Sequence, residues 1–213
     1  MDVLEAIRSR RSCRRFSTRP VEDGKINLVL EAGAWAPSPG NSQPWEFGVV
    51  AGSNLRRKIR ENADLALKYH LYEISGFRLT PLSYLQLHPL DAMGWGESKF
   101  PPDAATYDTS FLEQVPVIVA VAADPRQTPD GAEGRNDGYK YASAAAVQNM
   151  LLSAHFLGLG SLWFTLFHER TLKPVLGIVP EKHLIALVCL GYPEEQSKPP
   201  PRRSHEALVR RLG

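Results

Sequence analysis

The amino-acid sequence predicts a domain that mixes helices and strands around a sizeable core. Its 213 residues suit one substantial domain or two small ones. Hydrophobic residues make up 43% of the chain and charged residues 23%, which is an ordinary globular composition. Helix-like and strand-like segments succeed one another, and no internal repeat or linker divides them. We therefore expect residues 1–213 to form a single domain.

The first part of the chain is expected to be mainly helical. Asp2 can cap a first helix over residues 2–8, and a second helix is expected over residues 22–36, where Pro37 ends it. Residues 45–50 alternate between apolar and other side chains, which predicts a strand. A third helix is expected to begin at Ser53, because apolar residues then recur at roughly every fourth position.

The second part contains the strongest core signals. Residues 115–122 are a continuous apolar run, which predicts a strand buried on both faces. Residues 141–157 are apolar nearly all round, which predicts a central helix. The polar, glycine-containing residues 124–138 are expected to form a surface loop. Shorter elements are expected at 161–164 (strand), 169–176 (helix) and 183–190 (strand).

Residues 69–112 lack a regular pattern. The segment contains many aromatic residues with scattered proline and glycine, and a short helix fits only near 69–76. Long irregular segments in compact domains are usually lids, binding loops or disordered chain. The aromatic content favours an irregular lid or insert over residues 69–112.

The most basic stretch is residues 10–16, Arg-Arg-Ser-Cys-Arg-Arg-Phe. Arginine presents a planar fork of donors that fits phosphate oxygens. A phosphate site, a solvated basic turn and a nucleic-acid patch are all compatible with these seven residues alone. The net charge of only +2 argues against binding to long nucleic acid.

Residues 36–45 form a second candidate segment. They contain three prolines, two hydroxyls and two carboxamides, which suit a rigid turn that faces a polar heterocycle or a sugar. The same residue types also make an ordinary connector between a helix and a strand. This segment does not distinguish the two interpretations by itself.

Several common sites are absent from the sequence. The Gly-Leu-Gly at 158–160 follows a helix and lacks the third glycine of a dinucleotide-binding loop. There is no phosphate-loop or nucleophile-elbow motif, and the six histidines have no metal-ligand spacing, so no metal site is expected. Cys13 lies among arginines that favour a thiolate, which leaves a catalytic thiol as a minor alternative.

The N-terminal residues, the apolar stretches and the cysteines indicate where in the cell the protein is expected. The N-terminal residues have no apolar signal region, and no apolar stretch approaches the roughly 20 residues that span a bilayer. Cys13 and Cys189 fit neither a zinc site nor a disulfide framework. We expect a cytoplasmic protein with no membrane or nucleic-acid partner.

Four segments in order resemble the nitroreductase family of FMN-dependent NAD(P)H oxidoreductases. The resemblance covers nearly the full chain, although residues 69–112 and 124–138 are not covered. The matching segments are Arg-Arg-Ser-x-Arg-x-Phe at 10–16, Ala-Pro-Ser-x-x-Asn-Ser-Gln-Pro-Trp at 36–45, Ala-Ala-x-Gln-Asn-x-Leu-Leu followed by Gly-Leu-Gly-Ser-x-Trp within 145–163, and Leu-Gly-Tyr-Pro at 190–193 with a basic tail.

The resemblance implies an α+β fold with a central, mainly antiparallel sheet flanked by helices. It implies an intertwined homodimer with two FMN sites at the interface. The residues that match FMN phosphate and ribityl contacts are Arg10, Ser12 and Arg14, with Arg11 beside them. Arg202 and Arg203 of the tail match basic residues that meet the same phosphate. The residues that match a loop reaching the FMN of the other subunit are Ser38, Pro39, Gly40 and Asn41, followed by Gln43.

The resemblance also places Thr165 and Leu166 near the isoalloxazine ring. Many members carry an acid and glycines at this position, whereas this chain has Phe-Thr-Leu-Phe at 164–167. Asn62 is a candidate for an asparagine that contacts the flavin. The aromatic segment would shape a pocket for flat substrates, with Trp95, Phe100 and Tyr107 as lining candidates.

The implied function is hydride transfer from NADH or NADPH through flavin N5 to a nitroaromatic, a quinone or a similar electron-poor small molecule, in a ping-pong sequence. The cofactor carries this chemistry, which agrees with the lack of an evident acid, base or nucleophile. Two alternatives stay open. One is a specialised enzyme of the same fold that fragments flavin, dehalogenates or dehydrogenates, and the other is a non-catalytic flavin-binding protein.

Overall fold

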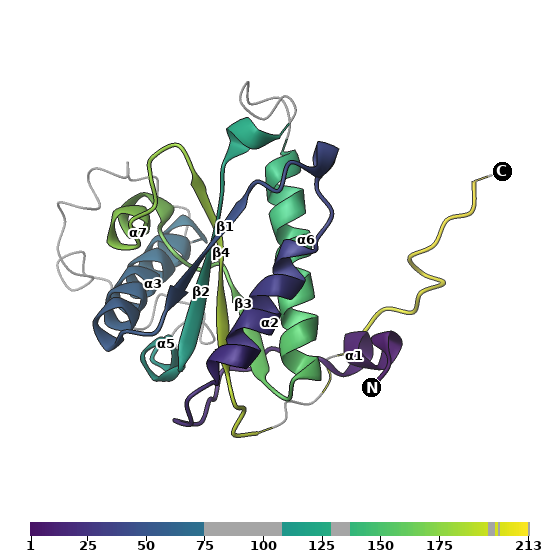
Figure 1. The fold of residues 1–213 in the computed structure, drawn as a ribbon, viewed down its shortest axis with the longest axis horizontal. Coiled ribbons are helices and arrows are strands. Elements are labelled where there is room, and N and C mark those ends of the chain that lie inside the picture. The colour runs from purple at the N-terminus through teal and green to yellow at the C-terminus, as the bar shows by residue number, and fades with distance from the viewer. Residues whose placement is uncertain (75–107, 129–136, 196–198, 200, 213) are drawn as a thin grey trace.

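The protein is a sheet covered on both faces by helices (Figure 1). The computed structural model describes residues 1–74, 108–128, 137–195, 199 and 201–212. Strands β1 (Trp45–Val50), β2 (Val117–Ala123), β4 (His183–Gly191) and β3 (Gly160–Phe164) lie side by side in that order. All three neighbouring pairs are antiparallel. The α+β architecture with a mainly antiparallel sheet is therefore confirmed.

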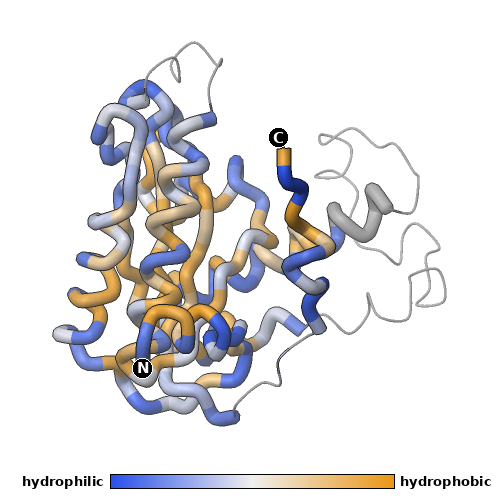
Figure 2. Tube along the Cα trace, turned by 90° about the vertical axis from the view of Figure 1, so that its right-hand side faces the viewer, coloured by the Kyte–Doolittle hydropathy of each residue, from blue (hydrophilic) through white to orange (hydrophobic). Residues whose placement is uncertain are grey.

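The two central strands explain the strongest apolar signals of the sequence. Every residue of β2 is buried, as predicted for a strand covered on both faces. Its neighbour β4 is buried over its last six residues, Ala186–Gly191. The register between these strands shifts between Val121 and Ala122. Figure 2 shows the hydrophobic residues concentrated in the strands and in the adjoining helices.

One face of the sheet is covered by α2 (Asp23–Ala34) and α6 (Gly138–Phe156). Their buried residues form one core cluster with the facing residues of the central strands, among them Val29, Val147, Met150, Val119 and Val188. The predicted central helix is thus confirmed, and Met150 of α6 packs against Gly33 of α2. Helix α6 runs the full height of this layer (Figure 1).

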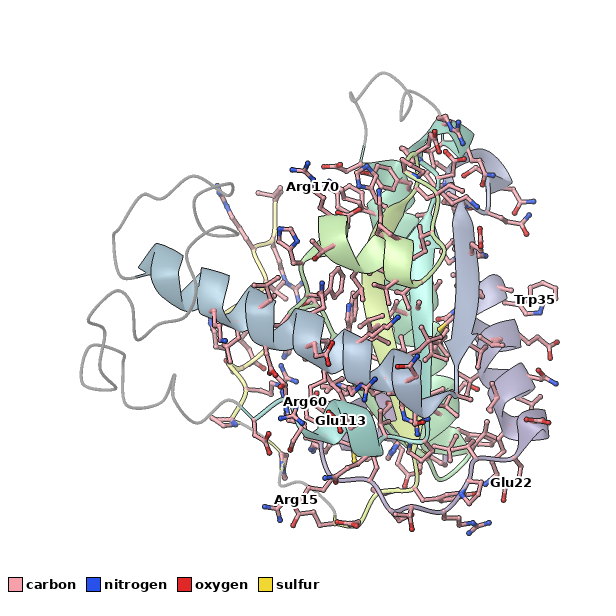
Figure 3. All side chains as sticks on the ribbon, turned by 90° about the vertical axis from the view of Figure 1, so that its left-hand side faces the viewer. Arg15, Glu22, Trp35, Arg60, Glu113 and Arg170 are labelled. Carbon is pink, nitrogen blue, oxygen red and sulfur yellow. The ribbon has the colours of Figure 1, made fainter. Side chains whose placement is uncertain are left out.

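The other face carries α3 (Ser53–Ile74), the short α5 (Phe111–Gln114) and α7 (Glu169–Val175). A second core cluster, which includes Ile59, Leu112 and Leu172, lies beneath them. Arg60 of α3 and Glu113 of α5 point toward each other, with 2.9 Å between Nη1 and Oε1 (Figure 3).

The chain ends lie outside these layers. Helix α1 (Val3–Ser9) is short, and the Asp2 carboxylate accepts the Glu5 amide at 2.8 Å, so the predicted cap is confirmed. Helix α1 packs beside the C-terminal end of α6, and the C-terminal segment 201–212 extends outward from there (Figure 1). Two single turns, η1 (Pro39–Asn41) and η5 (Pro125–Gln127), lie near the start of α6.

The helix expected near 69–76 is confirmed for residues 69–74, whereas the predicted irregular segment was too wide at its C-terminal end. Residues 69–74 continue α3 as one helix, and the chain is helical again at α5. Thr109, Phe111 and Leu112 are buried, so they belong to the core rather than to a cover. Residues 75–107 lie outside the described part of the chain, and the single-domain assignment stays a prediction. Within the described residues, no helix is both long enough and apolar enough to span a membrane.

Candidate functional site

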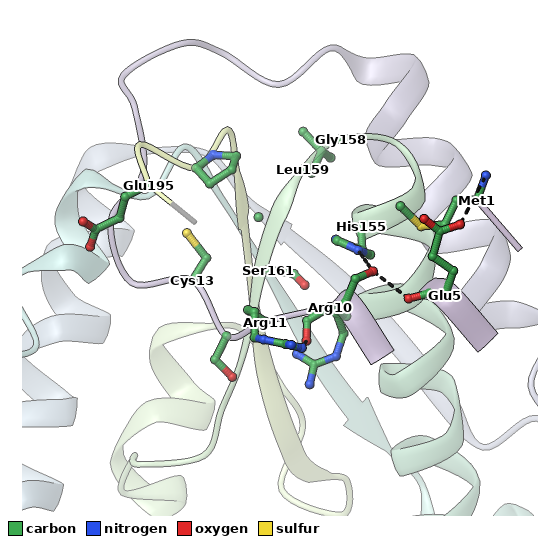
Figure 4. Close-up of a pocket in the computed structure, with 14 residues that line it drawn as sticks. Met1, Glu5, Arg10, Arg11, Cys13, His155, Gly158, Leu159, Ser161 and Glu195 are labelled. Atoms are coloured by element: carbon green, nitrogen blue, oxygen red, sulfur yellow. Dashed lines mark hydrogen bonds and ion pairs between the residues drawn. The ribbon is translucent and has the colours of Figure 1, made fainter. Parts of the chain in front are cut away.

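A cavity of about 400 Å³ opens where the basic stretch 10–16 meets the end of α6 and the start of β3 (Figure 4). Arg10, Arg11, Ser12 and Cys13 line it on one side. His155 of α6 and the residues 158–161 line it on another. Glu5 and Ser9 of α1 contribute as well. With Pro193 and Glu195, the lining comes from three separate segments of the chain.

Backbone pairing holds the basic stretch against the sheet. Ser12 forms a parallel bridge with Ser161, and the Cys13 amide donates to the Ser161 carbonyl at 2.9 Å. Phe16, which is buried, forms an antiparallel bridge with Pro193. Gly160 permits this close approach, because a Cβ there would stand 2.8 Å from Cys13 Sγ. The arginines are therefore fixed on an ordered segment at the edge of the sheet.

Arg10 is a half-buried cation without a balancing anion. Burial lowers the pKa of its guanidinium, and the charges of Arg11 and Arg202 lower it further. No carboxylate among the described residues pairs with it. Glu5 and Glu195, which also line the cavity, lie near the Met1 amino group at 3.9 Å and Arg15 at 3.4 Å. The site therefore favours an anionic ligand.

Two buried polar atoms of the cavity residues lack a partner. The guanidinium of Arg11 turns back toward α1, where Nη1 donates to the carbonyls of Arg8 and Arg10 at 2.7 Å each. Its Nε and the Ser161 Oγ are buried and have no hydrogen-bond partner within the described structure. Buried polar groups are usually hydrogen-bonded. The oxygens of a phosphate group would satisfy both, so these residues fit the phosphate end of FMN.

His155 also belongs to this cavity, although its position within an apolar helix indicated only a structural role. Its Nε2 lies 2.7 Å from Ser9 Oγ. Burial lowers the pKa of the imidazole, and the charges of Arg10 and Arg11 act in the same direction.

The proposal of a thiolate at Cys13 is wrong. The side chain is buried in the core cluster on the α3 side of the sheet. Burial raises the pKa of the Cys13 thiol, and its Sγ donates to the Arg15 carbonyl at 3.1 Å. An extended chain directs neighbouring side chains to opposite sides. Cys13 therefore packs against the core although it also lines the cavity, and the charges of Glu195 and Glu194 add to the effect of burial on the pKa of its thiol.

The remaining predicted phosphate ligands are not all gathered here. Arg14 is exposed and does not line the cavity. Arg202 lies close enough to Arg10 to lower the pKa of that guanidinium, which supports the predicted second arm. Arg203 instead donates to the Ala207 carbonyl at 3.1 Å within the exposed tail. Its contact with a phosphate, like that of Arg14, stays a prediction.

The predicted flavin loop lies at the other end of α6. The Asp124 amide, which precedes η5, donates to the Pro44 carbonyl at 2.9 Å, and η1 lies near the start of α6 (Figure 1). Gly40, Asn41 and Gln43 have φ values of 60°, 55° and 45°. Such conformations are rare for residues other than glycine and often occur at functional sites. Ser38 Oγ accepts the Gln43 amide at 3.0 Å and helps to fix the turn.

Thr165 and Leu166 follow the last residue of β3 and do not line the cavity. Thr165 is exposed, and Leu166 packs partly against the α3-side core. The cavity lies at the start of β3, and Thr165 and Leu166 follow its end. A ligand that contacted both the cavity and these two residues would therefore lie along β3. The predicted lining residues Trp95, Phe100 and Tyr107 lie outside the described residues.

Asn62 has a structural role in the described chain. Its side chain bonds the backbone of His168 and the hydroxyl of Thr171. These contacts join α3 to the loop that follows β3. The candidate contact between Asn62 and the flavin is therefore not supported.

The described chain thus combines an antiparallel α+β sheet with a cavity at its edge that is lined by arginines. The sequence matches the model of the nitroreductase family over residues 7–192, and the chain belongs to this family. It is 29% identical over 209 residues to an NADH dehydrogenase of Thermus thermophilus, with 98% of this chain and 95% of that protein covered.

Two further relatives bear on the site. An iodotyrosine deiodinase of Haliscomenobacter hydrossis is 27% identical over 202 residues, which covers 94% of this chain and 83% of that protein. A protein of Desulfovibrio desulfuricans was solved in complex with FMN. Its structure aligns with a TM-score of 0.68 at 28% identity and covers 100% of this chain and 98% of that one. The nitroreductase-like fold is thus confirmed.

Proposed function

We propose that this protein is an FMN-dependent oxidoreductase that accepts hydride from NADH or NADPH and passes it to a small electron-poor acceptor such as a nitroaromatic or a quinone. The observation that carries this proposal is the half-buried Arg10, which has no anionic partner in the described chain and lies in a cavity with two unpartnered buried polar atoms. The FMN complex of the Desulfovibrio relative supports the choice of cofactor.

Arg10 and Arg11 would hold the phosphate, with Ser161 and Ser12 beside them and Arg202 as a second arm. Arg14 and Arg203 are proposed to join once the complete site is assembled. Bound FMN would supply the acceptance and donation of hydride at its N5 atom. The backbone around Thr165 and Leu166 would orient the ring. Since no side chain needs to transfer a proton in this proposal, the absence of an evident acid or base in the sequence is compatible with it.

We propose that the active form is a homodimer. In one chain, the cavity is at the C-terminal end of α6, while Ser38, Gly40 and Asn41 lie near its N-terminal end (Figure 1). These two sets of residues cannot meet one FMN within a single chain. A second copy that brought its loop to this cavity would complete both sites.

Exposed apolar side chains support a partner on the outer face of α2 and α6. Trp35 at the end of α2 is 80% exposed and projects away from the body of the protein (Figure 3). Leu28, Tyr141 and Phe156 are also exposed. A second chain packed on these helices would remove these four apolar side chains from water.

A second candidate is a specialised reaction on the same fold, such as reductive dehalogenation. The similarity to an iodotyrosine deiodinase favours it, as does the Phe-Thr-Leu-Phe sequence at 164–167. In this case, the nicotinamide donor would still reduce the flavin, but nitroarenes would be poor acceptors. A non-catalytic flavin-binding protein would show neither reaction.

The visible spectrum of the purified protein under nitrogen tests these proposals. We expect a flavin absorbance band, its loss on addition of NADH or NADPH, and its return when a nitroarene is added. A colourless protein that does not take up added FMN would refute the proposed function. Bleaching by nicotinamide without recovery by nitroarene, but with recovery by a halogenated phenol, would favour the second candidate.

A further inference from the structure

The hydrogen bonds of His155 define where this side chain can gain a proton. Ser9 Oγ lies 2.6 Å from the Glu5 carbonyl oxygen, to which it donates its only hydrogen. The same oxygen lies 2.7 Å from His155 Nε2 (Figure 4). Because its hydrogen is already used, Ser9 Oγ must accept from Nε2–H. We therefore assign the neutral form to the Nε2–H tautomer, so that protonation takes place at Nδ1.

This assignment has a structural consequence. The bond from Nε2 to Ser9 exists in both the neutral and the protonated ring, so a change of charge leaves the contact between α1 and α6 intact. The protonated ring gains a second donor at Nδ1. His155 can therefore change charge without rearranging the wall of the cavity.

The charged groups around His155 oppose protonation in the free protein. The charges of Arg10 and Arg11 of the basic stretch lower the pKa of the imidazole, and Glu5 of α1 has a weaker effect of opposite sign. Glu195 of the C-terminal segment and the amino-terminal Met1 also line the cavity. Burial is the largest cause of the lowered pKa of the imidazole. With no anion bound, the neutral form is favoured near pH 7.

We propose that His155 is a further phosphate-binding residue of the cofactor site, which is neutral in the free protein and takes up a proton at Nδ1 when a phosphate dianion occupies the cavity. The inference rests on the proposed FMN function and deepens it. The proton comes from solvent, and no covalent bond changes. The dianion reverses the local field, because it places negative charge beside a ring that otherwise faces two guanidinium groups.

The sign of the pH dependence follows from this. The pKa of His155 is lowered in the free protein and is raised when the phosphate is bound. Binding is then most favourable below the free-state pKa and weakens as the pH rises through the bound-state pKa. Between these two values, the contribution of His155 to the dissociation constant changes by up to about tenfold per pH unit.

The direct test is the number of protons taken up when FMN binds. Calorimetric titrations at pH 7 in buffers of different ionisation enthalpy give this number for the wild type and for His155→Gln. Glutamine retains an amide donor for Ser9 but cannot titrate. His183→Gln is the matched control. His183 is the first residue of β4, contacts Glu169 of α7 and lies away from the cavity. The phosphate group of FMN contributes equally to all three proteins and cancels in the comparison.

We expect the wild type and His183→Gln to take up more protons than His155→Gln, with a difference of up to about one proton per site. Riboflavin, which lacks the phosphate, should show no such difference. Equal proton uptake by all three proteins, with FMN bound, would overturn the role of His155 and leave the proposed function intact. Failure of the wild type to bind FMN would instead refute the proposed function.

A second measurement needs no variant and covers the case in which His155→Gln does not fold. The ring resonances of His155 are followed by NMR as a function of pH, with and without FMN. The expected result is an increase of the midpoint on addition of FMN and no change with riboflavin. An unchanged midpoint with FMN bound would contradict the inference.

Discussion

The side chain of Asn62 pairs with the backbone of His168 through two hydrogen bonds. Its Oδ1 accepts from the His168 amide at 2.8 Å, and its Nδ2 lies 3.2 Å from the His168 carbonyl. Nδ2 also donates to Thr171 Oγ1 at 2.8 Å. Asn62 is buried, so these contacts replace bonds to water. They anchor the loop that carries Thr165 and Leu166 to α3.

Replacing Asn62 with alanine should therefore destabilise the protein. Because the His168 amide loses the acceptor that Asn62 Oδ1 provides, while the His168 carbonyl keeps the Leu172 amide and the Thr171 hydroxyl as donors, we expect a loss of about 1–3 kcal/mol in the free energy of unfolding. Urea unfolding measures it. Asn54→Ala is the control on the same helix, since Asn54 is exposed and should cost less than about 0.5 kcal/mol. Equal losses for the two variants would contradict the anchoring role.

Two glycines of α2 should respond oppositely to alanine. A Cβ on Gly33 would stand 3.0 Å from Met150 Cγ and 3.3 Å from Phe47 Cζ, whereas one on Gly24 would meet nothing within 4 Å. We expect Gly33→Ala to destabilise the protein by about 1–3 kcal/mol through overpacking. Gly24→Ala should be neutral or stabilise by up to about 1 kcal/mol through helix propensity. Thermal unfolding of both variants decides whether α2 and α6 are this close.

Among the arginines of the basic stretch 10–16, Arg10 should contribute most to the affinity for FMN. Arg10→Ala removes a cation that lines the cavity, and we expect FMN binding to weaken by about 1.5–3 kcal/mol, the scale of a charged hydrogen bond. Quenching of FMN fluorescence gives the dissociation constants. Arg15→Ala removes the same charge from the same stretch, but Arg15 is exposed and pairs with Glu195 at 3.4 Å. An equal effect of both variants would indicate a general charge effect rather than a site.

The contact between Glu22 and Tyr192 should make the stability depend on acidic pH. The Tyr192 hydroxyl donates to Glu22 at 2.6 Å, and this bond, a backbone bond and one from Arg19 lower the pKa of the carboxyl to about 2. The folded-state value is below the unfolded-state value. This stabilisation is therefore present above the ordinary pKa of glutamate and is lost as the pH falls through about 2.

We expect the denaturation midpoint of the wild type to increase from about pH 2.5 to about pH 5 by more than that of Glu22→Gln. In roughly this range, Glu22 is ionised in the folded protein but partly protonated in the unfolded protein. Glu31→Gln, on an exposed position of the same helix, should follow the wild type. Parallel curves for Glu22→Gln and the wild type would show that this carboxylate has no linkage to folding.

Mixed dimers test whether the cofactor site is shared between two chains. Arg10→Ala damages the cavity, and Asn41→Gly removes a loop side chain while glycine tolerates the positive φ of 55°. In a dimer of one chain of each kind, a shared site leaves one FMN site intact and damages the other twice. If each site is shared between the two chains, we expect about one tightly bound FMN per mixed dimer. Two weakened sites, each with the affinity measured for the dimer of one variant alone, would show that each site is built within one chain.

Much of the fold could be predicted because burial leaves a direct pattern in the sequence. The continuous apolar run of β2 and the nearly all-apolar α6 are both central elements in the structure. The end of α3 was harder to predict. Residues 69–74 extend this helix although the apolar pattern weakens there, because a helix that has already formed adds residues at little cost.

The candidate site was predictable only in part, since its chemistry depends on contacts between distant segments. Arg10, Arg11 and Ser12 were recognised as a local motif, and they share one cavity. His155 and Ser161 could not be assigned to it, because nothing in the sequence relates the end of α6 to the basic stretch. Cys13 was misjudged for the opposite reason. Its neighbours in sequence are arginines, but its neighbours in space are core residues.

The length of α6 fixes the distance between the two parts of the proposed cofactor site. The helix has 19 residues from Gly138 to Phe156. At 1.5 Å per residue, its ends are roughly 28 Å apart. Inserting or deleting one residue would change that spacing and rotate one end by about 100° relative to the other. Substitutions on α6 can be absorbed by repacking, whereas a change in its length would misalign both sites of a dimer together.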